Sequence, residues 1–158
     1  MENISLSPIG TVRSPVREIV DDVWGGLVSR IELDANRFTP DSLAGLEEFS
    51  HVEIVFHFHR LGEGDLITGK RRPRGRADWP EVGIFAQRAK LRPNRIGVTL
   101  CRLLSVEGLA ITVEGLDAID GTPVLDLKPY LTEFAPKGPL RQPKWASELM
   151  AGYWTKAR

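Results

Sequence analysis

The sequence predicts a mostly β protein, a small closed antiparallel β-barrel. Short stretches rich in β-branched and aromatic residues recur along most of the chain, and turns containing Gly or Pro separate them. Closure into a barrel is expected because it leaves no exposed strand edge. The 158 residues are 42% hydrophobic and 27% charged, which suits one soluble domain with a sizeable core.

The predicted elements follow one another with few interruptions. The first two strands are "SPIGTVRS" (7–14) and "GLVSRIEL" (26–33), each bounded by Pro or Gly. The stretch "TPDSLAGLEEFS" (39–50) predicts instead one or two helical turns after a Thr or Asp cap. Further strands are expected in "HVEIVFHFH" (51–59), "VGIFAQR" (82–88), "IGVTLCRLLSV" (96–106), "LAITVEGL" (109–116) and "PVLDLKPY" (123–130).

The carboxy-terminal residues 135–158 are expected to form an extended arm and a short helix. They would follow a barrel core of about residues 7–134, within a single domain over 1–158. The Pro-rich "EFAPKGPLRQPKW" predicts an arm that wraps the surface or a partner subunit. In "QPKWASELMAGYW", Trp145, Leu149 and Tyr153 recur at helical spacing.

The cellular compartment of the protein is indicated by targeting patterns that the sequence lacks and by its cysteine content. No signal-peptide pattern opens the chain, and no stretch approaches the roughly 20 apolar residues that a membrane span needs. The single cysteine, Cys101, suits a reducing compartment and lies in an apolar run, so we expect a buried structural thiol. A cytoplasmic protein with no membrane association is expected.

All three histidines lie in "SHVEIVFHFHR" (50–60), and in a strand they share one face. A metal site, a catalytic face and a solvated face would each suit that arrangement. His51 and His59 are eight residues apart, about 26 Å along a strand, so the three side chains cannot bind one ion from a regular strand. We therefore expect no metal site and favour a solvated or pocket-lining polar face.

Net charge is zero overall but unevenly distributed. Between Lys70 and Arg95 there are nine Lys or Arg residues and two carboxylates, a net charge of +7. Within this region, "GEGDLITGKRRPRGRADWP" (62–80) predicts a mobile surface loop with little to bury. It is either a solvated charged loop or a contact for the phosphates of RNA or another polyanion. The candidate nucleic-acid-binding residues are Lys70, Arg71, Arg72, Arg74 and Arg76.

The stretch "FAQRAKLRPNRIGVTL" (85–100) places several cations around a stiff corner. Pro93 fixes its own φ, and Asn94 tolerates a left-handed conformation while offering hydrogen bonds on a short stem. Such a corner can hold a carboxylate or a purine edge. An ordinary β-turn with solvated arginines explains the residues equally well.

The stretch "LDAIDGTPVLDLKPYL" (116–131) contains a tight turn at Asp120 and Gly121. Exposed turn backbone beside a carboxylate can bind a ribose diol or an amino group, although an ordinary hairpin entry is the simpler interpretation. No GxSxG, GxGxxG or Walker motif occurs in the sequence. A serine-hydrolase elbow and a Rossmann or P-loop nucleotide site are therefore not predicted.

Taken together, four segments carry a family resemblance: "IGTVRSP", "GLEEFSHVEIVFHFH", "GIFAQRAKLRPNRIGVTL" and "LDAIDGTPVLDLKPYL". In this order they resemble the TsaA-like, or TrmO-like, family of S-adenosylmethionine-dependent methyltransferases, over roughly residues 7–134. The resemblance implies a β-barrel homodimer that binds S-adenosylmethionine near the subunit interface. It also implies N6-methylation of threonylcarbamoyladenosine in the tRNA anticodon loop. The alternatives are the same barrel methylating a small molecule or another RNA, or a non-catalytic cofactor- or RNA-binding protein.

By position, the resemblance assigns cofactor contacts to His59, Arg60, Arg88, Leu100, Asp120, Gly121, Thr122 and Pro123. Asn94 and Tyr130 are expected to position the methyl acceptor as the catalytic residues, and the basic loop to contact tRNA phosphates. Two places depart from the family pattern. Members often carry a Pro-Arg-Gln-like segment where this chain has Asp22, Val23 and Trp24, and an amide side chain where it has Arg60.

Overall fold

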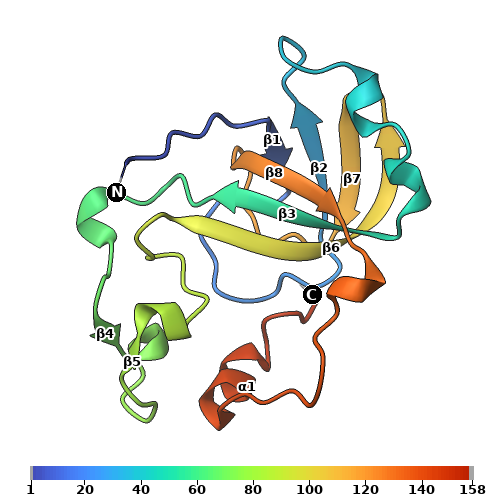
Figure 1. The fold of residues 1–158 in the computed structure, drawn as a ribbon. Coiled ribbons are helices and arrows are strands. Elements are labelled where there is room, and N and C mark those ends of the chain that lie inside the picture. Colours follow the sequence, from blue (N-terminus) through green and yellow to red (C-terminus); the bar gives the residue numbers. More distant parts are fainter. Residues whose placement is uncertain (1, 157–158) are drawn as a thin grey trace.

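The computed structural model describes residues 2–156 and shows a closed antiparallel barrel (Figure 1). Its strands are β1 (Gly10–Arg13), β2 (Val28–Leu33), β3 (His51–His57), β6 (Ile96–Glu107), β7 (Ala110–Glu114) and β8 (Pro123–Pro129). They pair in the order β1–β2–β7–β6–β3–β8, and β8 closes onto β1. The predicted closed barrel is confirmed. Residues 1, 157 and 158, which the predicted domain and arm included, lie outside the described part.

Strand β3 shows how the sequence pattern builds the core. Val52, Ile54 and Phe56 are at most 1% exposed, whereas the alternating residues between them are half-buried on the outer face. Phe58 packs against the same core and stacks edge-on with Phe56 at 5.3 Å between ring centroids. The predicted division into an apolar face and a histidine-bearing face is therefore confirmed for this strand.

Strand β6 is the longest and pairs with β3 along one half and with β7 along the other. A bulge between Leu103 and Ser105 lets it bend from one neighbour to the other. Gly97 lies opposite Phe56 in the β3–β6 ladder, and a Cβ there would come within 2.4 Å of the Phe56 ring. Glycine at this position is required because the large ring fills the space.

Two short 3₁₀ helices, η1 (Pro40–Leu43) and η2 (Leu46–Glu48), replace the predicted helical turns between β2 and β3. Gly45 separates them with a positive φ of 84°. Leu43 and Leu46 are buried in the barrel core, so these turns contribute to it from outside the strands.

The basic insertion between β3 and β6 differs from the prediction. It contains η3 (Glu63–Asp65), β4 (Lys70–Arg71), η4 (Pro73–Gly75), β5 (Val82–Gly83) and η5 (Ile84–Ala86), with β4 and β5 paired. The expectation of little burial in residues 62–80 is wrong because Trp79 is 3% exposed and Pro73 is fully buried. The predicted strand over 82–88 is also wrong beyond Gly83, since η5 begins at Ile84.

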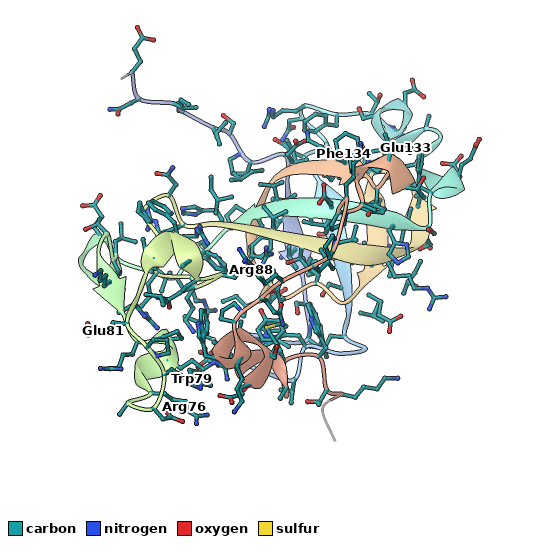
Figure 2. All side chains as sticks on the ribbon, turned by 60° about the horizontal axis from the view of Figure 1, so that its bottom comes forward. Arg76, Trp79, Glu81, Arg88, Glu133 and Phe134 are labelled. Atoms are coloured by element: carbon teal, nitrogen blue, oxygen red, sulfur yellow. The ribbon has the colours of Figure 1, made fainter. Side chains whose placement is uncertain are left out.

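After β8 the chain forms an exposed arm, residues 131–144, that includes η6 (Thr132–Phe134). The predicted helix is confirmed as α1 (Lys144–Met150), which is shorter than the spacing of aromatic residues suggested. Trp79 donates its indole N–H to Glu148 of α1 at 2.8 Å, so the helix packs on the basic insertion (Figure 2). No helix within residues 2–156 is both long and apolar enough to cross a lipid bilayer.

Candidate functional site

The end of β3 brings His59 to the turn that precedes β8. His57 is the last residue of β3, and His59 lies just beyond it in a turn. The Nε2 atom of His59 lies 3.9 Å from the place that a Cβ of Gly121 would occupy. Two candidate cofactor residues that are 62 positions apart in sequence are thus neighbours.

Both histidines at this end have a lowered pKa, which favours the uncharged imidazole. Burial lowers the pKa of His59 below its usual value of 6.5, the charge of Arg60 lowers it further, and so would a positive charge on His57. Burial and Arg95 lower the pKa of His57 in the same direction. An uncharged imidazole can accept a hydrogen bond and does not repel a cationic ligand.

The turn of Asp120, Gly121, Thr122 and Pro123 has its backbone donors already in use. Asp120 N–H donates to Val16 at 2.7 Å, Gly121 N–H to Val12 at 2.9 Å, and Thr122 N–H to Ile119 at 3.2 Å. Pro123 has no N–H to offer. Thr122 is 2% exposed, so we assign this residue a packing role in the turn.

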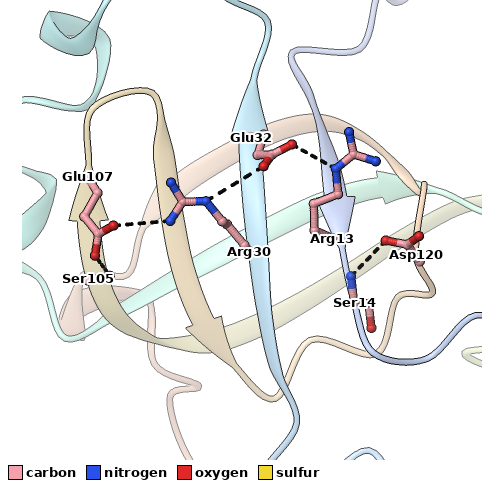
Figure 3. A network of polar contacts seen from close by, with 7 residues as sticks. All are labelled: Arg13, Ser14, Arg30, Glu32, Ser105, Glu107 and Asp120. Carbon is pink, nitrogen blue, oxygen red and sulfur yellow. Dashed lines mark hydrogen bonds and ion pairs between the residues drawn. The ribbon is translucent and has the colours of Figure 1, made fainter.

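What the turn can offer a ligand is therefore hydrogen-bond acceptors. Within residues 2–156, the carbonyl oxygens of Asp120 and Gly121 accept no hydrogen bond. The Asp120 carboxylate accepts one from the Ser14 N–H at 3.1 Å through a single oxygen (Figure 3). The turn thus suits an amino group or the hydroxyl groups of a ribose, and not a carboxylate.

Three arginines of the segment 88–95 offer donors. The Arg88 guanidinium donates to the Val98 carbonyl, that of Arg92 to Gln87 at 3.2 Å, and that of Arg95 to Leu61 at 2.6 Å. A carbonyl group orients each guanidinium without cancelling its charge, so the positive charges remain available to an anion.

The corner around Pro93 is a turn closed by the Arg95 N–H, which donates to the Arg92 carbonyl at 3.0 Å. The left-handed conformation in this corner is found at Arg95, whose φ is 52°, and not at Asn94, which would tolerate it. Asn94 occupies an inner position of the turn, and Arg95 the position that leads into β6. Asn94 itself remains beside the end of β3, since the Phe58 N–H donates to the Arg95 carbonyl at 2.8 Å.

Other predicted site residues lie elsewhere in the chain. Leu100 is 44% exposed on the outer face of β6, opposite Glu53, and about 13 Å along the strand from the His57 end. Tyr130 lies at the other end of β3, where its N–H donates to His51, in a shallow groove with Phe134. The structure therefore does not bring Tyr130 and Asn94 together in one chain, because the length of β3, about 20 Å, separates them.

The five candidate nucleic-acid-binding residues fall into two groups. Arg74 donates to both oxygens of Asp22 at 2.7 and 2.8 Å, and Arg76 is paired with Asp78 while it stacks on Trp79 (Figure 2). These ion pairs give the two side chains a structural role, and their contact with nucleic acid stays a prediction. Within residues 2–156, Lys70, Arg71 and Arg72 form no ion pair, and Arg72 donates to the Trp79 carbonyl.

One polar cluster near Arg88 has no counterpart in the sequence-based prediction. Thr99 and Tyr153 both donate their hydroxyl protons to the carboxylate of Asp117. Burial and the Asp117 charge raise the pKa of Tyr153, while the Arg88 charge opposes that rise. The only sequence signal was the helical spacing that placed Tyr153 near the carboxy-terminal helix.

The segment that departs from the family pattern, at Asp22, Val23 and Trp24, makes backbone contacts with residues near the carboxy-terminal end of the described chain. Trp24 N–H donates to the Tyr153 carbonyl at 2.8 Å and Gly25 N–H to that of Thr155 at 3.1 Å. Arg60, the second departure, is exposed and donates to Glu18 at 3.4 Å. Both departures therefore lie on the segment between β1 and β2 or contact it.

The outside of the barrel at β1 and β2 carries a ladder of exposed ion pairs instead of a site. Glu32 pairs with Arg13 at 2.8 Å and with Arg30 at 3.9 Å, and Arg30 also reaches Glu107 at 3.3 Å (Figure 3). Such exposed pairs contribute little stability individually.

The fold is that of a small β-barrel protein with a candidate ligand site at one barrel end, distinct from a doubly wound nucleotide-binding sheet. Residues 22–135 match the tRNA-methyltransferase O N-terminal domain model, and the chain belongs to this family. A crystal structure of TrmO from Pseudomonas aeruginosa is similar, with 31% identity and a TM-score of 0.73, covering 92% of this chain and 62% of that one.

Curated relatives agree with this assignment. A probable S-adenosyl-L-methionine-binding protein of Pyrococcus abyssi is 36% identical, with 83% of this chain and 70% of that protein covered. The tRNA (adenine(37)-N6)-methyltransferase of Escherichia coli is 37% identical, with 83% and 59% covered. The mouse tRNA (adenine(37)-N6)-methyltransferase is 48% identical over 59% of this chain, and the match spans about a fifth (21%) of that enzyme.

Proposed function

We propose that this protein is an S-adenosylmethionine-dependent methyltransferase that methylates N6 of adenine 37 in tRNA, in its threonylcarbamoylated form. The names of the Escherichia coli and mouse relatives support this activity. The observation that carries the proposal is the proximity of His59, whose pKa is lowered, to the acceptor-rich turn at Gly121. Arg88, whose guanidinium is oriented by the Val98 carbonyl, is the candidate donor. Residues 7–134 would form the catalytic barrel.

The chain's groups suit S-adenosylmethionine, which supplies a methyl group activated by a sulfonium. The carbonyls of Asp120 and Gly121, and the second carboxylate oxygen of Asp120, would accept hydrogen bonds from its amino or ribose hydroxyl groups. Arg88 would attract its carboxylate. The neutral ring of His59 would tolerate a cationic sulfur, which a protonated imidazole would repel. His59, with its lowered pKa, is also a base that could accept a hydrogen bond from an acceptor amine.

We propose further that the protein is a cytoplasmic homodimer. Leu100 and Tyr130 are distant from His59 in one chain, and a second copy would allow them to approach the same ligand. Light scattering at micromolar concentration measures this directly. A monomer under these conditions would refute the dimer.

Calorimetric titration with S-adenosylmethionine and with its demethylated product tests the cofactor site. We expect saturable binding that Arg88→Ala and Asp120→Asn each weaken about tenfold, the loss of one charge-assisted hydrogen bond. Arg37→Ala is the matched control, because Arg37 is an exposed arginine that also donates to a carbonyl, that of Pro8 at 2.6 Å. Absence of binding to the folded protein would refute the cofactor assignment.

A methyl-transfer assay with tRNA that carries the threonylcarbamoyl group but lacks the methyl group tests the substrate. We expect one methyl group per tRNA, lost when adenine 37 is replaced. Cofactor binding without transfer to this tRNA would refute the substrate and leave the cofactor site standing.

A further inference from the structure

Phe85 is a large apolar side chain held out of the protein core. It is 77% exposed, while its neighbour Ile84 is 1% exposed and Gln87 is 7% exposed. Gln87 donates its side-chain amide to the carbonyls of Arg71 at 3.2 Å and Val82 at 3.0 Å, and Ile84 N–H donates to Gly69 at 3.0 Å. The 3₁₀ helix η5 is thus anchored on both sides of Phe85, which fixes the aromatic ring outward.

Two cations lie on β4, the strand that pairs with β5 just before this position. The backbone of Lys70 pairs with that of Gly83, two residues before Phe85, and Arg71 pairs with Val82. Within residues 2–156, neither Lys70 nor Arg71 forms an ion pair, unlike Arg74 in the same insertion. An exposed aromatic ring among free cations matches single-stranded nucleic acid, which offers flat bases and phosphates together.

We propose that Phe85 is a stacking platform for an unpaired nucleobase of the RNA substrate, with Lys70 and Arg71 on the adjoining phosphates. This inference rests on the proposed tRNA substrate and names the part of the RNA that this surface binds. Phe85 precedes Arg88 by three residues, a span of at most about 11 Å. The stacked base is therefore a loop nucleotide close to the one that enters the cofactor site.

A second exposed phenylalanine provides a matched control. Phe134 is 78% exposed on η6, beside Glu133 and on the other side of the molecule from Glu81 and Trp79 (Figure 2). Its exposed area is the same as that of Phe85, but its neighbourhood lacks the free cations of β4. A nonspecific effect of removing an exposed ring would appear equally in both variants.

Fluorescence anisotropy with two RNA probes tests the platform, one a short stem-loop and the other a fully paired duplex. We expect Phe85→Ala to weaken stem-loop binding about tenfold, the lower part of the range for one stacked base, and to leave duplex binding within about twofold. Phe85→Trp should retain stem-loop affinity, and Phe134→Ala should match the wild type. Lys70→Gln should weaken both probes and reduce the salt slope by about one.

Direct stacking is visible with 2-aminopurine in the loop, whose fluorescence should be quenched by the wild type and not by Phe85→Ala. Equal stem-loop affinity of wild type and Phe85→Ala would overturn the platform while the tRNA substrate stands. A change of oligomeric state in Phe85→Ala would also overturn it and assign Phe85 to a protein interface. No binding of either RNA by the wild type would refute the platform and the RNA substrate together.

Discussion

Gly25 lies where the last residues of the chain cross the segment between β1 and β2. A Cβ at Gly25 would lie 1.9 Å from the carbonyl oxygen of Trp154 and 2.6 Å from its carbonyl carbon. Both are backbone atoms, so rotation of a side chain cannot relieve the overlap. We therefore expect Gly25→Ala to separate residues 152–156 from residues 23–25.

The loss of stability expected for Gly25→Ala follows from the hydrogen bonds that join the two segments. Val23, Trp24 and Gly25 donate backbone N–H groups to Gly152, Tyr153 and Thr155 at 3.4, 2.8 and 3.1 Å. At about 1 kcal/mol for each hydrogen bond, their loss lowers the free energy of unfolding by about 3 kcal/mol. For a domain of this size that corresponds to a fall in Tm of about 6–12 °C.

Thermal denaturation and amide hydrogen exchange measure this effect. Gly64→Ala is the matched control, because a Cβ at Gly64 meets no atom within 4 Å and its φ is not positive. We expect the control to retain the wild-type Tm and the Gly25→Ala variant to lose protection at the Trp24 amide. A Gly25→Ala protein with wild-type Tm and a protected Trp24 amide would refute the stabilising role of the terminal segment.

Four further measurements follow from single sites. Val23 is a β-branched residue with a positive φ of 64°. Val23→Gly should therefore relieve strain, raise the free energy of unfolding by about 1 kcal/mol net and raise Tm by a few degrees. An unchanged or lower Tm would contradict this. Gly97→Ala should lower the free energy of unfolding by about 1–3 kcal/mol in urea, because its Cβ would overlap the buried Phe56 ring. Titration of cofactor affinity should be flat above about pH 6.5 and fall as acid charges His59, with no such fall in His59→Asn. Burial raises the pKa of Cys101 to about 12, so its alkylation at about pH 8 should require unfolding, as mass spectrometry of native and urea-treated protein can show.

The barrel could be predicted because its strands repeat a local pattern. In β3 the alternation of Val52, Ile54 and Phe56 with polar residues is visible in seven residues and determines which face is buried. Closure required no further information, since several short antiparallel strands without a long helix have few ways to cover their edges.

The basic insertion could not be predicted because its order depends on distant partners. Arg74 is paired with Asp22, 52 residues away, and Trp79 with Glu148, 69 residues away. Composition alone indicated a charged loop, since one Trp and two Pro residues among many cations give no periodic signal. The same long-range pairing explains why Arg74 is held by Asp22, while Lys70, four residues earlier, forms no ion pair within residues 2–156.

In the candidate site, too, some features depend on the local sequence and others depend on tertiary structure. Family resemblance named the residues around Gly121, and the structure adds that His59 faces this turn. The hydrogen-bond character of the turn could not be predicted, since it depends on whether Val12 and Val16 accept the N–H groups of Gly121 and Asp120. Those acceptors belong to a strand and a loop more than 100 residues earlier in the chain.

The arrangement of hydrogen-bond acceptors and donors in the candidate site has a chemical consequence for the ligand. Among the candidate cofactor residues, Asp120 and Gly121 offer hydrogen-bond acceptors, and Arg88 offers an oriented cation. A ligand that carries only negative groups would face acceptors at the turn, and a ligand that carries only positive groups would face Arg88. A zwitterionic ligand with hydroxyl groups satisfies both kinds of residue, and the lowered pKa of His59 beside the turn disfavours a further positive charge there. The amino acid and ribose portions of S-adenosylmethionine have this combination of groups, which is the physical reason to test that cofactor before any simple anion.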